Sequence, residues 1–326
     1  MLLRPRSRLS FRMLKVRVEK NRVFFGDRFS VSFQRTLRIP DDGKVYPLPP
    51  GLGLFPVHEA QECLGGRIPE GWDEMDLFIP LYQREALWLG FDGAKWKPNA
   101  VKVGVGKINV VSGTAWDKEL HQEPQDYMVC PQQPWLDGIN AGANFIRQFV
   151  ATPLGQGYTV EAQMTGEEEH GGIQLLVYEP KPGVFPDKPP PRTRLEPSRM
   201  MAMSSPQGEM GLSAGGKMKQ KIYPDPFGID VWNTDDYGSV FVRLVNSQQY
   251  SELTGKSAPE PPINARTYTE YGLPWFDLYD ETRPDLAAPE SLARINSVRE
   301  IDEQRGAHMQ DDTSIPIDDN QVKKIR

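Results

Sequence analysis

Apolar and polar residues alternate along several short segments of this chain. In residues 13–19, Leu14, Val16 and Val18 alternate with charged neighbours, and a period of two is typical of a strand with one buried face. The same alternation recurs in residues 28–40 and 100–113, and turn pairs such as Asp42-Gly43 separate such runs. We therefore expect a mainly β fold with a sandwich, jelly-roll or barrel-like core.

Glycines interrupt the valine-rich run of residues 100–113. A nucleotide-binding loop would need a helix directly after "GVGKIN" so that backbone N–H groups face the phosphates, and no helical pattern follows. Gly104 and Gly106 instead indicate a strand with a bulge or a close backbone approach.

Helical patterns are few and short. Residues 57–65, 142–152 and 159–166 are candidate helices, and residues 246–255 form another, with Ser247 as its cap and Gly255 as its end. Because long helices do not alternate with strands, a doubly wound α/β fold is not expected.

The chain divides into segments of different composition. The proline and glycine content, 30 and 29 residues, favours strands, turns and extended loops. We expect a flexible basic arm in residues 1–12, a β-rich domain in 13–180, a Pro-rich loop or linker in 181–208, a β-rich continuation in 209–281 and a polar tail in 282–326.

The tail contains one patterned stretch. An apolar stripe predicts an amphipathic helix over residues 290–304 that is either solvated or docks a partner, and the last twenty residues are expected to be disordered. Deletion of residues 283–326 should then leave the thermal stability of the core nearly intact.

Charge and cysteine content limit the function classes. A net charge of -6 argues against a nucleic-acid partner, and no apolar run is long enough to span a membrane. Two free thiols are expected at Cys63 and Cys130 rather than a disulfide. The arginines of residues 1–12 resemble a transit peptide, and Met13 offers an alternative start, but a cytoplasmic protein is expected.

Four residues are candidates for catalysis. Cys130 could act as a nucleophile with His121 or His170 as its base, although no cation or helix start lies nearby in the sequence to stabilise a thiolate. Glu161 and His170 could form an acid–base pair at one end of the fold. The alternative, which we favour, is a glycine-bounded helix, an acidic turn and then a buried strand.

Metal and aromatic sites are also considered. The oxygen-rich stretch 225–236 offers Asp225, Asp230, Asp235 and Asp236, but it lacks a known calcium-loop spacing and favours a turn. Neither a metal site nor any cofactor is therefore expected. The indole-and-acid groups of "QQPWLDG", "DVWNTDD" and "YGLPWFD" are candidate binding surfaces, with Trp135, Asp137, Trp232 and Trp275.

Two phrases resemble other proteins. "WLDGINAGANFIRQFVATPLGQGYTVEAQMTGEEEHGGIQLLVYEP" and "GGKMKQKIYPDPFGIDVW" are similar to a set of uncharacterised bacterial and filamentous fungal proteins. The resemblance covers residues 135–180 and 215–232, and it implies no activity and no site residues.

We expect a non-catalytic binding or structural module that meets a protein partner through a strand edge or the carboxyl-terminal segment. The alternative is a carboxylate-dependent hydrolase or carbohydrate-active protein with an aromatic-lined cleft. Two acids 5–10 Å apart in such a cleft would favour the hydrolase. An exposed strand edge or apolar patch would favour the binding module.

Overall fold

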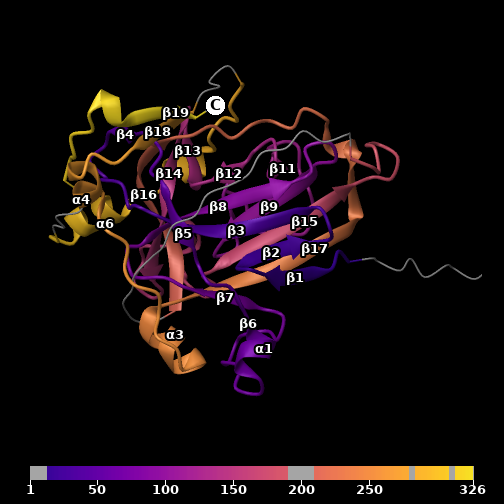
Figure 1. Ribbon diagram of the computed structural model, residues 1–326, viewed down its shortest axis with the longest axis horizontal. Helices are drawn as coiled ribbons and strands as arrows, with labels where there is room; N and C mark the ends of the chain where they lie inside the picture. The colour runs from indigo at the N-terminus through magenta and orange to yellow at the C-terminus, as the bar shows by residue number, and fades with distance from the viewer. Residues whose placement is uncertain (1–12, 190–208, 279–282, 308–312, 326) are drawn as a thin grey trace, which may run out of the picture.

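The computed structural model describes residues 13–189, 209–278, 283–307 and 313–325, and it confirms a mainly β fold (Figure 1). The strands are β1 (Val16–Glu19), β2 (Arg22–Phe25), β3 (Phe29–Thr36), β4 (Val45–Tyr46), β5 (Gly51–Leu54), β6 (His58–Glu59), β7 (Leu77–Pro80), β8 (Ala86–Gly93), β9 (Asn99–Val105), β10 (Ile108–Asn109), β11 (Met128–Cys130), β12 (Trp135–Leu136), β13 (Gly138–Gly142), β14 (Phe145–Pro153), β15 (Ile173–Pro180), β16 (Glu209–Lys219), β17 (Trp232–Val245), β18 (Trp275–Leu278) and β19 (Val322–Ile325).

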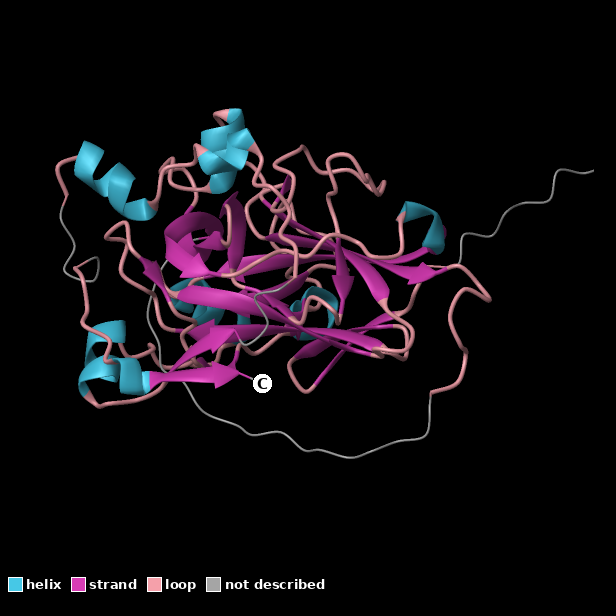
Figure 2. Cartoon of the chain, turned by 90° about the horizontal axis from the view of Figure 1, so that it is seen from above, coloured by secondary structure: helices cyan, strands magenta, loops and turns pink. Residues whose placement is uncertain are grey.

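Short helices connect the strands (Figure 2). They are α1 (Ala60–Leu64), α2 (Val160–Thr165), α3 (Ser247–Thr254), α4 (Ala265–Glu270), α5 (Glu290–Ala293) and α6 (Val298–Gln304), with 3₁₀ turns η1 (Ile229–Val231) and η3 (Asp319–Gln321). None of the helices in the described ranges is long and apolar enough to cross a membrane.

The caps explain where the two predicted helices α2 and α3 begin and end. Thr159 accepts the Ala162 N–H at the start of α2, and Gly166 ends it in the left-handed conformation. In α3 the cap is Asn246, which accepts the Gln249 N–H, rather than the predicted Ser247; the expected end at Gly255 is confirmed.

The helix predicted over residues 142–152 is wrong, because Gly142 ends β13 and residues 145–152 belong to β14. This strand pairs with β16 along Phe145–Pro153 and with β13 and β8 on its other side. The spacing of its apolar residues suits a helix locally, but strand partners on both sides satisfy its backbone groups and decide the outcome.

The strands β1 through β17 all belong to one hydrogen-bonded sheet. Antiparallel pairs dominate it: β3 pairs with β8, β9 with β15, and β15 with β17, while β4–β16 and β7–β17 are parallel. A separate parallel pair, β18–β19, lies near the carboxyl end. The finer choice among sandwich, jelly roll and barrel stays a prediction.

The strand β9 is buried on both faces. Val101, Val103 and Val105 join the main apolar core with residues of β3, β8 and β15. Ala100 points the other way and joins a smaller apolar cluster that contains Leu176, Tyr178 and Trp232. Because side chains alternate along a strand, Lys102 lies on this second face.

The carboxyl-terminal segment differs from the expected polar tail. The single helix over 290–304 is two shorter helices, α5 and α6. The apolar stripe expected to be solvated or to dock a partner is buried against the chain's own core, at Leu292, Ile295, Val298 and Ile301. Residues 322–325 form β19 instead of a disordered end. Deletion of residues 283–326 should therefore lower the thermal stability of the core instead of leaving it nearly intact.

Several other expectations concern the connecting segments and the ends of the chain. The basic arm 1–12 and most of the Pro-rich segment, residues 190–208, lie outside the described residues. The predicted turn at Asp42-Gly43 is confirmed, with Gly43 at φ 84° and the Lys44 N–H donating to Asp42 Oδ1. The domain boundaries proposed from composition stay predictions.

Candidate functional site

A buried lysine organises the loop that covers the outer face of β9. The Lys102 side chain is fully buried, and its Nζ lies 2.6 Å from Asp117 Oδ1 and 2.7 Å from Asp126 Oδ2. It also donates to the backbone carbonyl of Glu119 at 2.5 Å. A charge in this position requires close partners, because removing an ammonium from water costs several kcal/mol. Lys102 therefore holds the loop 113–127 onto the sheet.

The close approach predicted at Gly104 is confirmed beneath this loop. A Cβ on Gly104 would lie 2.6 Å from the Trp116 ring, closer than side chains pack. The backbone N–H of Trp116 donates to the backbone carbonyl of Lys107, and the Tyr178 hydroxyl donates to the backbone carbonyl of Lys118. Only glycine at position 104 lets the indole lie against the strand.

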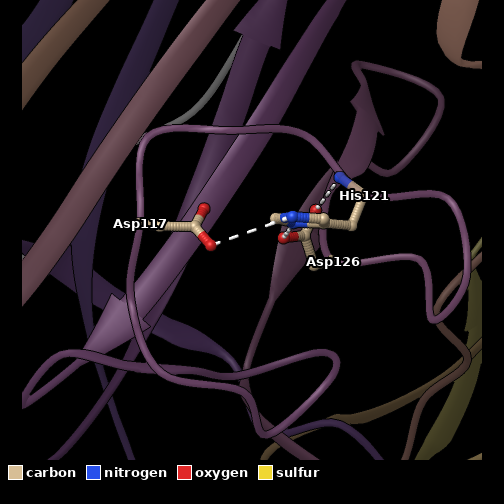
Figure 3. Close-up of side chains that lie close together, drawn as sticks. All are labelled: Asp117, His121 and Asp126. Atoms are coloured by element: carbon tan, nitrogen blue, oxygen red, sulfur yellow. Dashed lines mark hydrogen bonds and ion pairs between the residues drawn. The ribbon is translucent and has the colours of Figure 1, made fainter.

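His121 and Asp126 form a tight pair in the same loop (Figure 3). His121 Nδ1 lies 2.8 Å from Asp126 Oδ2, and the His121 backbone N–H donates to Asp126 Oδ1 at 2.9 Å. Asp126 is 1% exposed. Because an ionised carboxylate only accepts hydrogen bonds, the geometry assigns the proton of the neutral imidazole to Nδ1 and the lone pair to Nε2.

The other side of the imidazole faces two more carboxylates. His121 Nε2 lies 3.9 Å from Asp117 Oδ2 and 4.0 Å from Glu119 Oε2. The ligand atoms of Asp117, His121 and Asp126 all lie within 4.8 Å of one another. With a neutral imidazole, the three carboxylates and the Lys102 ammonium sum to two negative charges.

The ionisation of Asp117 bears on the hydrolase alternative. Burial opposes ionisation of Asp117, but hydrogen bonds from Lys102 and from the Glu119 N–H, together with the Lys102 charge, hold the pKa of this carboxyl below its usual value. A glycosidase acid must carry a proton at working pH. Asp117 is therefore a poor general acid, although it lies close to Asp126 and beside Trp116.

Glu161 and His170 lie close together, but the Glu161 carboxylate contacts the backbone of His170 and not its imidazole. Glu161 is buried, and its Oε1 accepts the backbone N–H groups of Glu169 at 3.1 Å and His170 at 2.9 Å. Its Oε2 accepts the Gly171 N–H at 2.8 Å. The carboxylate thus meets the backbone of His170, and its hydrogen bonds close the acidic turn onto α2.

The thiol candidate is part of the core. Cys130 ends β11 opposite Asn99 and is fully buried, and burial raises the pKa of its thiol well above the ordinary value. A raised pKa disfavours the nucleophilic thiolate. Both cysteines are free, as expected, and Cys63 is half-buried.

Asp225 is engaged by two aromatic donors. Its Oδ2 accepts the Tyr127 hydroxyl at 2.7 Å and Trp232 Nε1 at 2.9 Å, while its Oδ1 accepts the Phe227 N–H. The Asp235 N–H donates to Asn233 Oδ1, which is the side-chain turn anticipated from sequence. The other candidate oxygen ligands lie in η1 or β17: Asp230, Asp235 and Asp236.

The indole-and-acid candidates lie mostly inside the protein. Trp232 and Trp275 are 1% and 0% exposed, and Trp135 is half-buried in β12. Asp137 is buried and accepts Gln220 Nε2 at 2.8 Å. Burial raises the pKa of Asp137 to about 7, against hydrogen bonds from Gln220 and Trp135 that favour its ionised form. A binding role for these four residues stays a prediction.

The residues that the structure gathers around His121 were missed by sequence reasoning. Lys102, Asp117, Glu119 and Asp126 are separated by up to 24 positions and match no spacing motif. The one available signal was a lysine at the centre of a valine-rich strand that proves to be buried on both faces.

Comparisons with protein-family models, with curated proteins and with solved structures each return no match for this chain.

Proposed function

We propose that this protein is a non-catalytic binding module that accepts an extended, acidic segment of a partner protein along the edge of β19. The observation that carries the proposal is the position of this strand. Within residues 13–189, 209–278, 283–307 and 313–325, β19 pairs only with β18, so its outer edge has no strand partner. Figure 2 shows the last strand at the periphery of the structure.

An unpaired strand edge is a template for a further strand. Its outward N–H and C=O groups can form a ladder with an incoming extended segment, which supplies affinity through the main chain. β18 is itself anchored to the body of the protein, because Leu48 and Phe276 exchange two backbone hydrogen bonds. The edge is therefore presented by a fixed support.

The charge of the edge selects the partner. Lys323 and Lys324 are adjacent and exposed in the four-residue strand. Two lysines disfavour pairing with a second copy of β19 by like-charge repulsion, and they favour a segment that carries Asp or Glu.

Exposed apolar side chains lie beside the start of the same strand. Tyr271 is 72% exposed and Leu273 is 38% exposed. Gln321, which directly precedes β19, donates through Nε2 to the backbone carbonyls of Thr269 and Leu273. This contact brings the apolar pair next to the edge, where it can anchor an apolar residue of the incoming segment.

The proposal is tested with a defined probe. A synthetic peptide that alternates valine with aspartate is titrated into the full chain, and binding is followed by amide hydrogen exchange across residues 313–325. We expect slower exchange in β19. The double variant Lys323→Glu/Lys324→Glu should weaken binding by about tenfold, since reversing two exposed charges removes about 1–2 kcal/mol.

Two controls make the test specific. A peptide that alternates valine with lysine should bind far more weakly than the aspartate peptide. The matched double variant Lys181→Glu/Lys188→Glu changes two lysines that are exposed elsewhere, and it should bind like the wild type. The proposal would be overturned if the wild type and Lys323→Glu/Lys324→Glu bound the aspartate peptide equally well, or if the peptide slowed amide hydrogen exchange only in other strands.

A further inference from the structure

We infer that His121 Nε2, Asp117 and Glu119 form a binding site for one divalent first-row transition metal, with zinc as the best match. This inference does not rest on the proposed partner edge. It also goes beyond the sequence, from which no metal and no cofactor is expected. Three features of the loop support the site: the direction of the imidazole, the positions of the two oxygen ligands and the charge.

The imidazole is oriented in the way that metal-bound histidines are. A ligating histidine normally donates its second ring N–H to a carboxylate or a carbonyl, which fixes the ring and raises the basicity of the ligating nitrogen. Asp126 is that carboxylate for His121 Nδ1, at 2.8 Å. Asp126 is in turn held by Lys102, so the supporting carboxylate cannot rotate away from the ring.

The distances from the imidazole nitrogen to the two carboxylate oxygens suit one small cation. Oxygen and nitrogen ligands bind zinc at about 2.0–2.2 Å, so two tetrahedral ligands lie about 3.4 Å apart. His121 Nε2 is 3.9 Å from Asp117 Oδ2 and 4.0 Å from Glu119 Oε2. Glu119 is 86% exposed, so its side chain can move the remaining distance, whereas the Asp117 carboxylate is held through Oδ1 and needs only a rotation of about 0.5 Å at Oδ2.

Lys102 does not occupy the same position as the metal. It binds Asp117 through Oδ1 on the buried side, whereas Oδ2 faces His121. The two net negative charges of the cluster match one divalent cation. A mixed set of imidazole and carboxylate ligands suits zinc, manganese or iron better than calcium, which prefers six or more oxygens.

Three protein ligands would leave a fourth position for water. Figure 3 shows the Asp117 carboxylate facing the His121 ring, with Asp126 against the same ring. A site of this kind could pin the loop 113–127, since the ligands come from its middle and Lys102 already fixes its base.

Zinc alone is the probe for the test. Isothermal titration calorimetry of the full chain with zinc chloride should give one saturable site. Glu119→Gln, which changes a side chain that is 86% exposed, and His121→Gln should each weaken the affinity by at least about tenfold. Nitrogen NMR of the imidazole should report coordination at Nε2 of His121, a signature that a merely structural role would not produce.

A matched control separates this site from non-specific binding by histidine and acid. His170 also follows three glutamates, Glu167–Glu169, so His170→Gln removes another histidine that has acidic neighbours in the sequence. We expect His170→Gln to bind zinc like the wild type. Absence of saturable binding, or the same affinity in His121→Gln as in the wild type, would overturn the inference; a loss of affinity in His170→Gln alone would assign the metal to the other turn.

Discussion

The Lys102 ammonium lies 2.7 Å from the Asp126 carboxylate, and the exposed fractions of the two side chains are 0% and 1%. This ion pair joins the central strand β9 to the loop that carries His121. Because both side chains are buried away from solvent, the loss of one partner leaves an uncompensated charge inside the protein. The pair therefore couples the stability of the sheet to the order of the loop.

Replacing Lys102 by methionine should reduce the free energy of unfolding by about 3–5 kcal/mol, because Asp126 is left buried without its cation. Urea denaturation of the full chain measures the effect. Lys118→Met changes an exposed neighbour and should stay within about 0.5 kcal/mol of the wild type. If the two variants unfolded at the same urea concentration, Lys102 would not be the anchor described here.

Glu161→Gln should destabilise the fold by about 1–3 kcal/mol, because the carboxylate accepts three backbone N–H groups and an amide cannot accept all of them. His170→Gln should have little effect, since only the backbone N–H of that residue contributes to the contact. Denaturant unfolding of both variants provides the comparison. A larger loss for His170→Gln than for Glu161→Gln would point to a role for the imidazole.

The buried Asp137 should make stability depend on pH. Its pKa is raised to about 7 in the folded protein from an ordinary value of 3.8. The folded state therefore keeps a proton that the unfolded state releases, and the contribution is fully present below about pH 4 and is lost as pH rises to about 7. Relative to Asp137→Asn, which does not ionise, the wild type should lose about 1.4 kcal/mol per pH unit in this window.

Thermal or urea unfolding of the wild type and Asp137→Asn at several pH values between 4 and 8 checks this sign. The difference between the two proteins should level off above about pH 7, where Asp137 is ionised in both states. A difference that stays constant across the range would show that Asp137 does not titrate in this way.

Leu292→Ala should destabilise the protein by about 2–5 kcal/mol, because Leu292 is fully buried in the main core. Leu273→Ala is the matched control, since Leu273 is 38% exposed and leaves no cavity. For the same reason, deletion of residues 283–326 should lower the melting temperature markedly. A truncated chain that melts like the full chain would restore the view of these residues as a dispensable tail.

Local pattern was enough for the elements whose cause is local. The period-two runs around Val16 and Val103 predict strands because successive side chains of a strand point to opposite faces, and the structure confirms both strands. Gly166 predicts the end of α2 because a left-handed glycine acts within one turn, and the structure confirms it. Cysteine content and context correctly favoured free thiols.

The tertiary structure alone decided the rest. Residues 142–152 carry a helical spacing, yet strand pairing on both sides makes residues 145–152 part of β14. Leu292 and Val298 belong to an apolar stripe that suits a solvated helix, yet both side chains are buried in the protein. Burial and pairing depend on which distant segments meet, and a local pattern contains no information about that.

The cluster at His121 shows the same division. The sequence by itself determined a strand with a lysine at its centre and a polar loop after it. Only the packing of that loop on the second face of β9 brought Asp117 and Asp126 onto Lys102 and set the direction of the His121 ring. The energy of a buried charge depends on atoms within a few ångströms, and the fold supplies those atoms from separate parts of the loop.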